Sequence, residues 1–119
     1  MLSASLWLLL AAGLYGSLLG ALHLRAGGTR PASWRALPHG IIGLAGFVVL
    51  LLALRGPPRG QAMGVAAFGE IAAVLFAIAL ALGLVLPFLR RRGLGLAIAV
   101  HASVAIGGIV ILAAYALVG

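Results

Sequence analysis

Residues 101–112 read HASVAIGGIVIL, an apolar run that starts with a histidine and carries two adjacent glycines about two helical turns later. Residues 39–50 read HGIIGLAGFVVL, and the two stretches align on their histidines, His39 and His101. In this alignment Gly46 meets Gly108, and aliphatic residues match at five of the other ten positions. Two membrane helices rich in Leu, Ala, Val and Gly also resemble each other by chance, and the shared histidine is the feature that favours a chain built from two related halves.

The composition indicates an integral membrane protein. Hydrophobic residues make up 65% of the chain and charged residues only 8%, whereas soluble domains carry about 25% charged residues. The net charge of +7 comes from arginines in short loops rather than on one folded face, so we expect no nucleic-acid partner. The chain has no cysteine, which excludes disulfides and thiolate metal sites.

Four apolar runs are long enough to cross a bilayer, which takes roughly 20 residues. They span residues 2–24, 37–54, 63–89 and 94–118, and the second has a lead-in turn at Pro31 or Ser33. The first run lacks the basic start and the cleavage site of a signal peptide, so we expect it to be retained. The predicted fold is all-α: one transmembrane domain, residues 1–119, forming an up-down antiparallel four-helix bundle of two repeated two-helix halves.

Arginines in the loops predict the orientation in the membrane. The first and third loops, which share a side, hold six arginines, and the second loop holds two. The positive-inside rule then puts the arginine-rich side in the cytoplasm and both termini outside, as in a multi-pass protein of the inner (cytoplasmic) membrane. An inverted or dual orientation is the open alternative.

Two histidines at one depth in hydrocarbon favour a cofactor site, because buried imidazoles in membranes are costly and usually face the bundle interior. Two imidazoles on facing helices suit the axial positions of a haem iron. Small residues after each histidine would let the macrocycle approach the backbone, and arginines would pair with its propionates; the candidates are Gly43, Gly46, Gly108, Arg35 and Arg92. The alternatives are that these glycines pack helix against helix and that these arginines only set the topology.

The arrangement resembles the small four-helix membrane b-type cytochromes, including the cytochrome b561-like group, in its bundle and its two histidine-centred stretches. The resemblance implies haem b, electron transfer, and a quinone or a redox protein as partner. Di-haem members of that group have histidine pairs at both membrane faces, whereas this chain has three histidines, all toward one face. One bis-histidine haem near the cytoplasmic side is therefore expected, in a protein that works as a subunit or with a partner.

Two further ionisable residues are candidates for a proton or partner site. His23 lies at the inner end of the first helix, at the membrane interface, where a histidine costs little free energy and needs no function. The functional alternatives are a hydrogen bond to a quinone and a role as an alternate ligand to the same iron. Glu70 is the only acidic residue and lies in the third apolar run. It could carry a proton or cation, or it could reach the outer interface and pair with a loop arginine.

The predicted function is membrane electron transfer rather than hydrolase or transferase chemistry, because the chain lacks aspartate for a triad and a second carboxylate for a metal pair. The alternatives from other classes are a small transporter that uses Glu70 and a structural subunit of a membrane complex. The small bundle also favours a homo-oligomer or a larger assembly.

Overall fold

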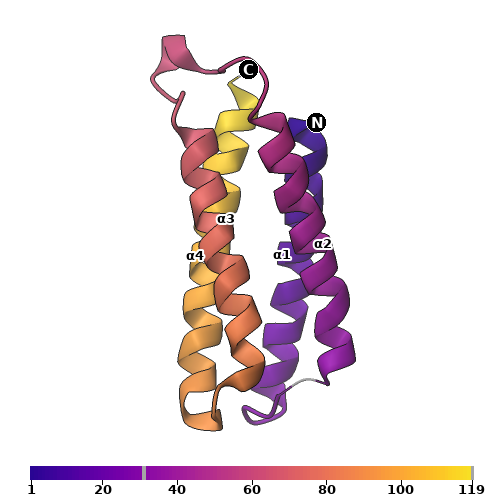
Figure 1. Ribbon diagram of the computed structural model, residues 1–119. Helices are drawn as coiled ribbons and strands as arrows, with labels where there is room; N and C mark the ends of the chain where they lie inside the picture. The colour runs from indigo at the N-terminus through magenta and orange to yellow at the C-terminus, as the bar shows by residue number, and fades with distance from the viewer. Residues whose placement is uncertain (31, 119) are drawn as a thin grey trace.

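The computed structural model describes residues 1–30 and 32–118, so the expected lead-in residue Pro31 lies outside the described part. Four long helices run up and down through the molecule (Figure 1): α1 (Leu2–Arg25), α2 (Ser33–Ala53), α3 (Phe68–Val85) and α4 (Arg91–Leu117). Two short 3-10 turns, η1 (Gln61–Met63) and η2 (Leu86–Phe88), flank α3. The predicted all-α four-helix bundle is confirmed.

The helices have the length and the surface of membrane spans. The molecule measures 48 × 22 × 21 Å, and a bilayer with its headgroups is about 40–45 Å thick. Each long helix is apolar enough to cross it, and each exposes large apolar side chains, such as Trp7, Ile41, Leu84 and Leu96. Helices that are apolar all round are typical of membrane spans. The fold is that of a multi-pass membrane protein.

The bundle consists of two helical hairpins. Helix α1 packs along α2 and α3 along α4, while α1 touches α4 and α2 touches α3 between the hairpins, so α2 and α4 lie diagonally opposite. The loop residues 26–30 and 86–90 lie at one end, which we call the arginine-rich end. The two termini and the loop at residues 54–67 lie at the other, the terminal end (Figure 1).

Helix α3 is shorter than its apolar run of residues 63–89. At its start, Gly60 and Gly64 take left-handed φ angles of 69° and 70° on either side of η1, and the helix begins only at Phe68. At its end, Pro87 lies in η2, and proline disfavours a continuing helix. The terminal-end loop is therefore longer than the hydropathy alone predicts.

The tightest packing lies toward the terminal end, where Leu50 and Leu112 are fully buried. The same contact recurs in both hairpins: Leu9 of α1 covers Gly46 of α2, and Phe76 of α3 covers Gly108 of α4. A Cβ at Gly46 would lie 2.8 Å from Leu9 Cγ, and one at Gly108 would lie 3.1 Å from the Phe76 ring. These repeat-related glycines let the two helices of each hairpin approach closely.

Alanine at Gly108 is expected to destabilise the bundle by about 1–3 kcal/mol, because the new methyl group would press on the Phe76 ring. The neighbouring Gly107→Ala is the matched control, since its Cβ would meet only Leu75, at 3.9 Å. Thermal or SDS-induced unfolding in detergent, followed by circular dichroism, measures both. Equal midpoints for the two variants would contradict this packing role.

Candidate functional site

The structure brings His39 and His101 together on the bundle axis. His39 projects from α2 and His101 from the diagonally opposite α4. The two ring centroids are 5.9 Å apart, and the ring planes are nearly perpendicular, at 78°. Both side chains are half-buried. At about 1.5 Å per residue, His39 lies some 9 Å and His101 some 15 Å from the start of its helix at the arginine-rich end.

Each imidazole is oriented by a backbone carbonyl of its own hairpin. His39 Nδ1 lies 2.9 Å from the Ala12 carbonyl oxygen of α1, and His101 Nδ1 lies 2.8 Å from the Ala79 carbonyl oxygen of α3. A carbonyl oxygen only accepts hydrogen bonds, so Nδ1 carries the proton in both rings. In a neutral imidazole the lone pair then belongs to Nε2, and a backbone carbonyl on the other ring nitrogen is the usual arrangement behind a metal-bound histidine.

A glycine makes room for each ring. Gly16 and Gly83 lie one helical turn beyond Ala12 and Ala79, and in an α-helix a residue at that position covers the preceding carbonyl. A Cβ at Gly16 would lie 2.7 Å from His39 Cε1, and a Cβ at Gly83 would lie 3.3 Å from His101 Cε1. In both hairpins the missing side chain of a glycine leaves a notch in the helix surface, and through it an imidazole reaches a helical carbonyl. We call Gly16 and Gly83 the notch glycines.

Sequence comparison missed the notch glycines because the two halves differ in loop length. His39 lies 27 residues after its carbonyl partner, whereas His101 lies 22 residues after its own. A single offset that aligns the histidines therefore misaligns α1 with α3. Allowing the inter-helix loop to vary would have aligned Ala12 with Ala79 and Gly16 with Gly83.

The glycines predicted to cradle a macrocycle have a different role in two of three cases. Gly46 and Gly108 are covered by Leu9 and Phe76, and the Gly46 carbonyl also accepts a hydrogen bond from Ser5 Oγ at 2.9 Å. Gly43 is near the site only because it faces Ala12. A Cβ built on Gly43 would lie 3.9 Å from the Ala12 Cβ. Gly46 and Gly108 thus serve helix packing, the alternative reading of the small residues.

Packing around the histidine pair is uneven. Toward the terminal end, buried side chains close the bundle, including Leu9, Phe76 and Leu112. Toward the arginine-rich end, only His23 and Leu94 are buried among the residues described, 1–30 and 32–118. The bundle is therefore more loosely packed on the arginine-rich side of the histidines.

The predicted propionate partners lie at the arginine-rich end, away from the imidazoles. Arg35 is exposed, with its guanidinium 5.3 Å from the centroid of the Trp34 ring. It precedes His39 by about one helical turn, roughly 6 Å along the axis. Arg92 is also exposed and precedes His101 by some 14 Å along α4. Both are on the loosely packed side of the pair.

His23 has a structural role in the first loop. Its side chain is buried, and its Nδ1 lies 2.9 Å from the Thr29 carbonyl oxygen. The helix end beside it is a Schellman motif, in which the Gly28 N–H donates to the His23 carbonyl at 2.9 Å. His23 is also some 16 Å along α1 from Ala12, the residue that His39 contacts. This position separates His23 from the histidine pair and gives no support to its prediction as an alternate ligand to the same iron.

Glu70 lies outside the bundle interior. It occupies the first turn of α3, at the terminal end, and its side chain is exposed. A carboxylate in the first turn of a helix is stabilised by the helix dipole and by free N–H groups. This position matches the interfacial alternative for Glu70 and gives no support to a carboxylate at the centre of a transport path.

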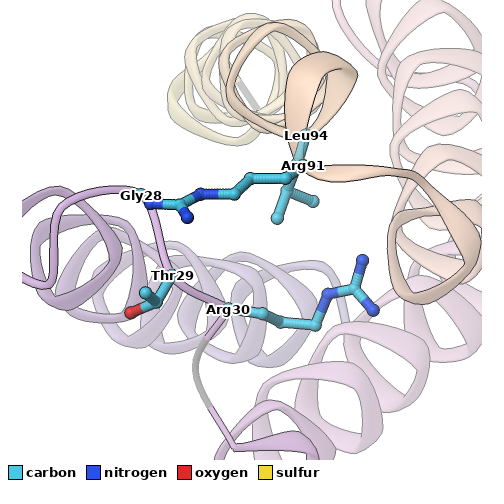
Figure 2. Close-up of a pocket in the computed structure, with 5 residues that line it drawn as sticks. All are labelled: Gly28, Thr29, Arg30, Arg91 and Leu94. Carbon is cyan, nitrogen blue, oxygen red and sulfur yellow. The ribbon is translucent and has the colours of Figure 1, made fainter.

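Two arginines that the sequence did not single out tie the hairpins together at the arginine-rich end (Figure 2). Arg30, in the first loop, donates to the carbonyls of η2 and its flank, including Leu89 at 2.6 Å. Arg91, at the start of α4, donates to the Gly27 carbonyl of the first loop at 2.9 Å. Each side chain reaches from one loop to the other and donates to backbone carbonyls that follow a helix. Both arginines therefore have the structural role of linking the two hairpins.

The fold and this site together define a class: a multi-pass helical membrane bundle with two carbonyl-oriented histidines on diagonal helices. Comparison of the chain with protein-family models, with curated proteins and with solved structures gave no match. The chemistry of the site must therefore be argued from its own residues.

Proposed function

We propose that this chain is a membrane haem-b-binding electron-transfer protein or cytochrome subunit, with His39 and His101 as the axial ligands of one haem. The observation that carries the proposal is the pair of imidazoles on diagonal helices, each with Nδ1–H on a helical carbonyl and Nε2 free. Haem b held there would supply one-electron redox chemistry.

The donor set and its spacing fit such a group. Metal–imidazole bonds are about 2 Å long, so two rings on opposite sides of one metal ion would have centroids roughly 6 Å apart. The observed separation is 5.9 Å. Two imidazoles alone leave a small metal ion such as zinc short of its usual four ligands. In the described residues no group of three or more His, Cys, Asp or Glu side chains could complete such a site. A haem macrocycle would supply the remaining donors to its iron.

The chain's own residues would position the imidazoles. The carbonyls of Ala12 and Ala79 fix the ring orientation and raise the basicity of Nε2, while the notch glycines leave the rings room to reach those carbonyls. The loose packing on the arginine-rich side would admit the macrocycle. Arg35 and Arg92 are the proposed partners of its propionates at that end.

In this proposal the arginine-rich end faces the cytoplasm, by the positive-inside rule, and both termini face outward. One haem near one membrane face cannot by itself move electrons across the bilayer. The protein would therefore exchange electrons with a quinone or a redox partner protein, as a homo-oligomer or as a subunit of a larger complex.

The test is an oxidised and a dithionite-reduced absorption spectrum of the wild-type protein, purified in mild detergent from haem-replete cells, with haem and protein quantified separately. The expected result is a low-spin b-type spectrum and one haem per chain. A folded, detergent-purified protein that stays colourless after haem is added to it would refute the proposal.

A further inference from the structure

A hollow at the arginine-rich end is lined by three arginines from consecutive elements. Arg25 is the last residue of α1, Arg30 lies in the following loop, and Arg35 lies in the first turn of α2. The hollow has a volume of about 490 Å³ and is open to the outside. Neither histidine lines it, but Arg35 is also a proposed partner of a haem propionate, so the two proposals share that residue.

The chain has no acid of its own for this hollow. Its one acidic residue is Glu70, at the opposite end of a molecule 48 Å long. Arg30 donates to carbonyls of the third loop, so its guanidinium is already partnered, whereas Arg25 and Arg35 are exposed. Two exposed cations beside one hollow repel each other, and an anion between them relieves that repulsion. An anionic ligand would supply the counter-charge that the chain lacks at this end.

The backbone at the hollow also favours an anion. Ala32, which lines it, precedes α2 and offers no capping side chain, so N–H groups of the first turn lack a side-chain acceptor. Such N–H groups, at the positive end of the helix dipole, are a common phosphate site. Guanidinium groups bind phosphate through paired, charge-assisted hydrogen bonds.

The depth and surroundings of the hollow select a lipid. It lies at one end of a bundle whose length matches a bilayer with its headgroups, and that is where lipid phosphates lie. Leu24, Trp34 and Leu37, on the same two helices, are strongly exposed, at 77%, 69% and 63%. We propose that Arg25 and Arg35 bind the phosphate group of an anionic phospholipid, with its acyl chains against this apolar surface.

The experiment compares lipids retained by the whole chain in native mass spectrometry, after release from nanodiscs of equal parts phosphatidylcholine and phosphatidylglycerol. We expect the wild type to retain phosphatidylglycerol preferentially. Arg25→Gln with Arg35→Gln is expected to lower that preference roughly five-fold for each arginine removed. Both side chains are exposed, so the fold is retained, and circular dichroism checks this. The matched control is Arg55→Gln with Arg59→Gln, at the terminal end.

Each other outcome overturns the proposal. Equal retention of the two lipids by the wild type, or equal loss in both double variants, would exclude a specific site at this hollow. Displacement of the lipid by millimolar inorganic phosphate would identify a free-phosphate site instead. Repeating the measurement on His39→Ala protein separates this proposal from the haem proposal, because the lipid preference is expected to persist without haem.

Discussion

Replacing either His39 or His101 with alanine is expected to abolish the low-spin b-type spectrum. In the proposed function each imidazole would hold the haem from one side, so a single variant would leave a five-coordinate, high-spin haem or lose the haem. The double variant is expected to be colourless yet folded, because both side chains are only half-buried. Absorption spectra and haem-to-protein ratios of the purified variants measure the effect.

Two control variants make this result specific. His23→Ala removes the third histidine, which holds the first loop through Thr29, and is expected to keep the wild-type spectrum. Glu70→Gln removes the only carboxylate and is expected to do the same. A low-spin spectrum that survives in His39→Ala or His101→Ala, or that disappears in His23→Ala alone, would contradict the ligand assignment.

Valine at Gly16 is expected to weaken haem retention about 10- to 100-fold, the usual cost of disturbing a group that orients a metal ligand. Even a Cβ at this position would lie 2.7 Å from His39 Cε1, so the ring must leave the Ala12 carbonyl. The matched control is Gly20→Val, one turn further along α1, where an added Cβ has no neighbour within 4 Å. Competition for haem by apomyoglobin measures retention in both.

The two notch glycines are also expected to differ in how strongly their substitution weakens haem retention. A Cβ at Gly83 would lie 3.3 Å from His101 Cε1, a contact that a small shift of the ring can relieve. Alanine is therefore expected to be milder at Gly83 than at Gly16. Equal haem retention in Gly16→Val and Gly20→Val would mean that the notch does not position the imidazole.

Hydropathy was sufficient to predict the four helices, because every run of apolar residues long enough to cross a bilayer forms one. The predicted apolar run, residues 63–89, extends beyond α3 at both ends. It starts inside the turn between Gly60 and Gly64 and continues past Pro87. Because of that overrun, Glu70 was expected inside a helix that in fact begins only two residues before it.

The repeat predicted that His39 and His101 share a depth, but not what holds their rings. That contact is to backbone carbonyls, which carry no sequence signal, through glycines in the other helix of each hairpin. Gly46 and Gly108 stood out because they align with each other, yet their alignment reflects a repeated packing contact. The crossed contacts of Arg30 and Arg91 depend on the spatial meeting of two loops and were likewise beyond sequence reasoning.

Low-temperature electron paramagnetic resonance of the oxidised wild-type protein tests the central claim most directly. Two imidazole ligands with nearly perpendicular planes, as at the observed 78°, leave two iron d orbitals close in energy and give a strongly anisotropic low-spin ferric signal. That signal, lost in His39→Ala and in His101→Ala, is the predicted result. A high-spin ferric signal in the wild type, or no haem signal after reconstitution, would contradict bis-histidine haem ligation by this chain.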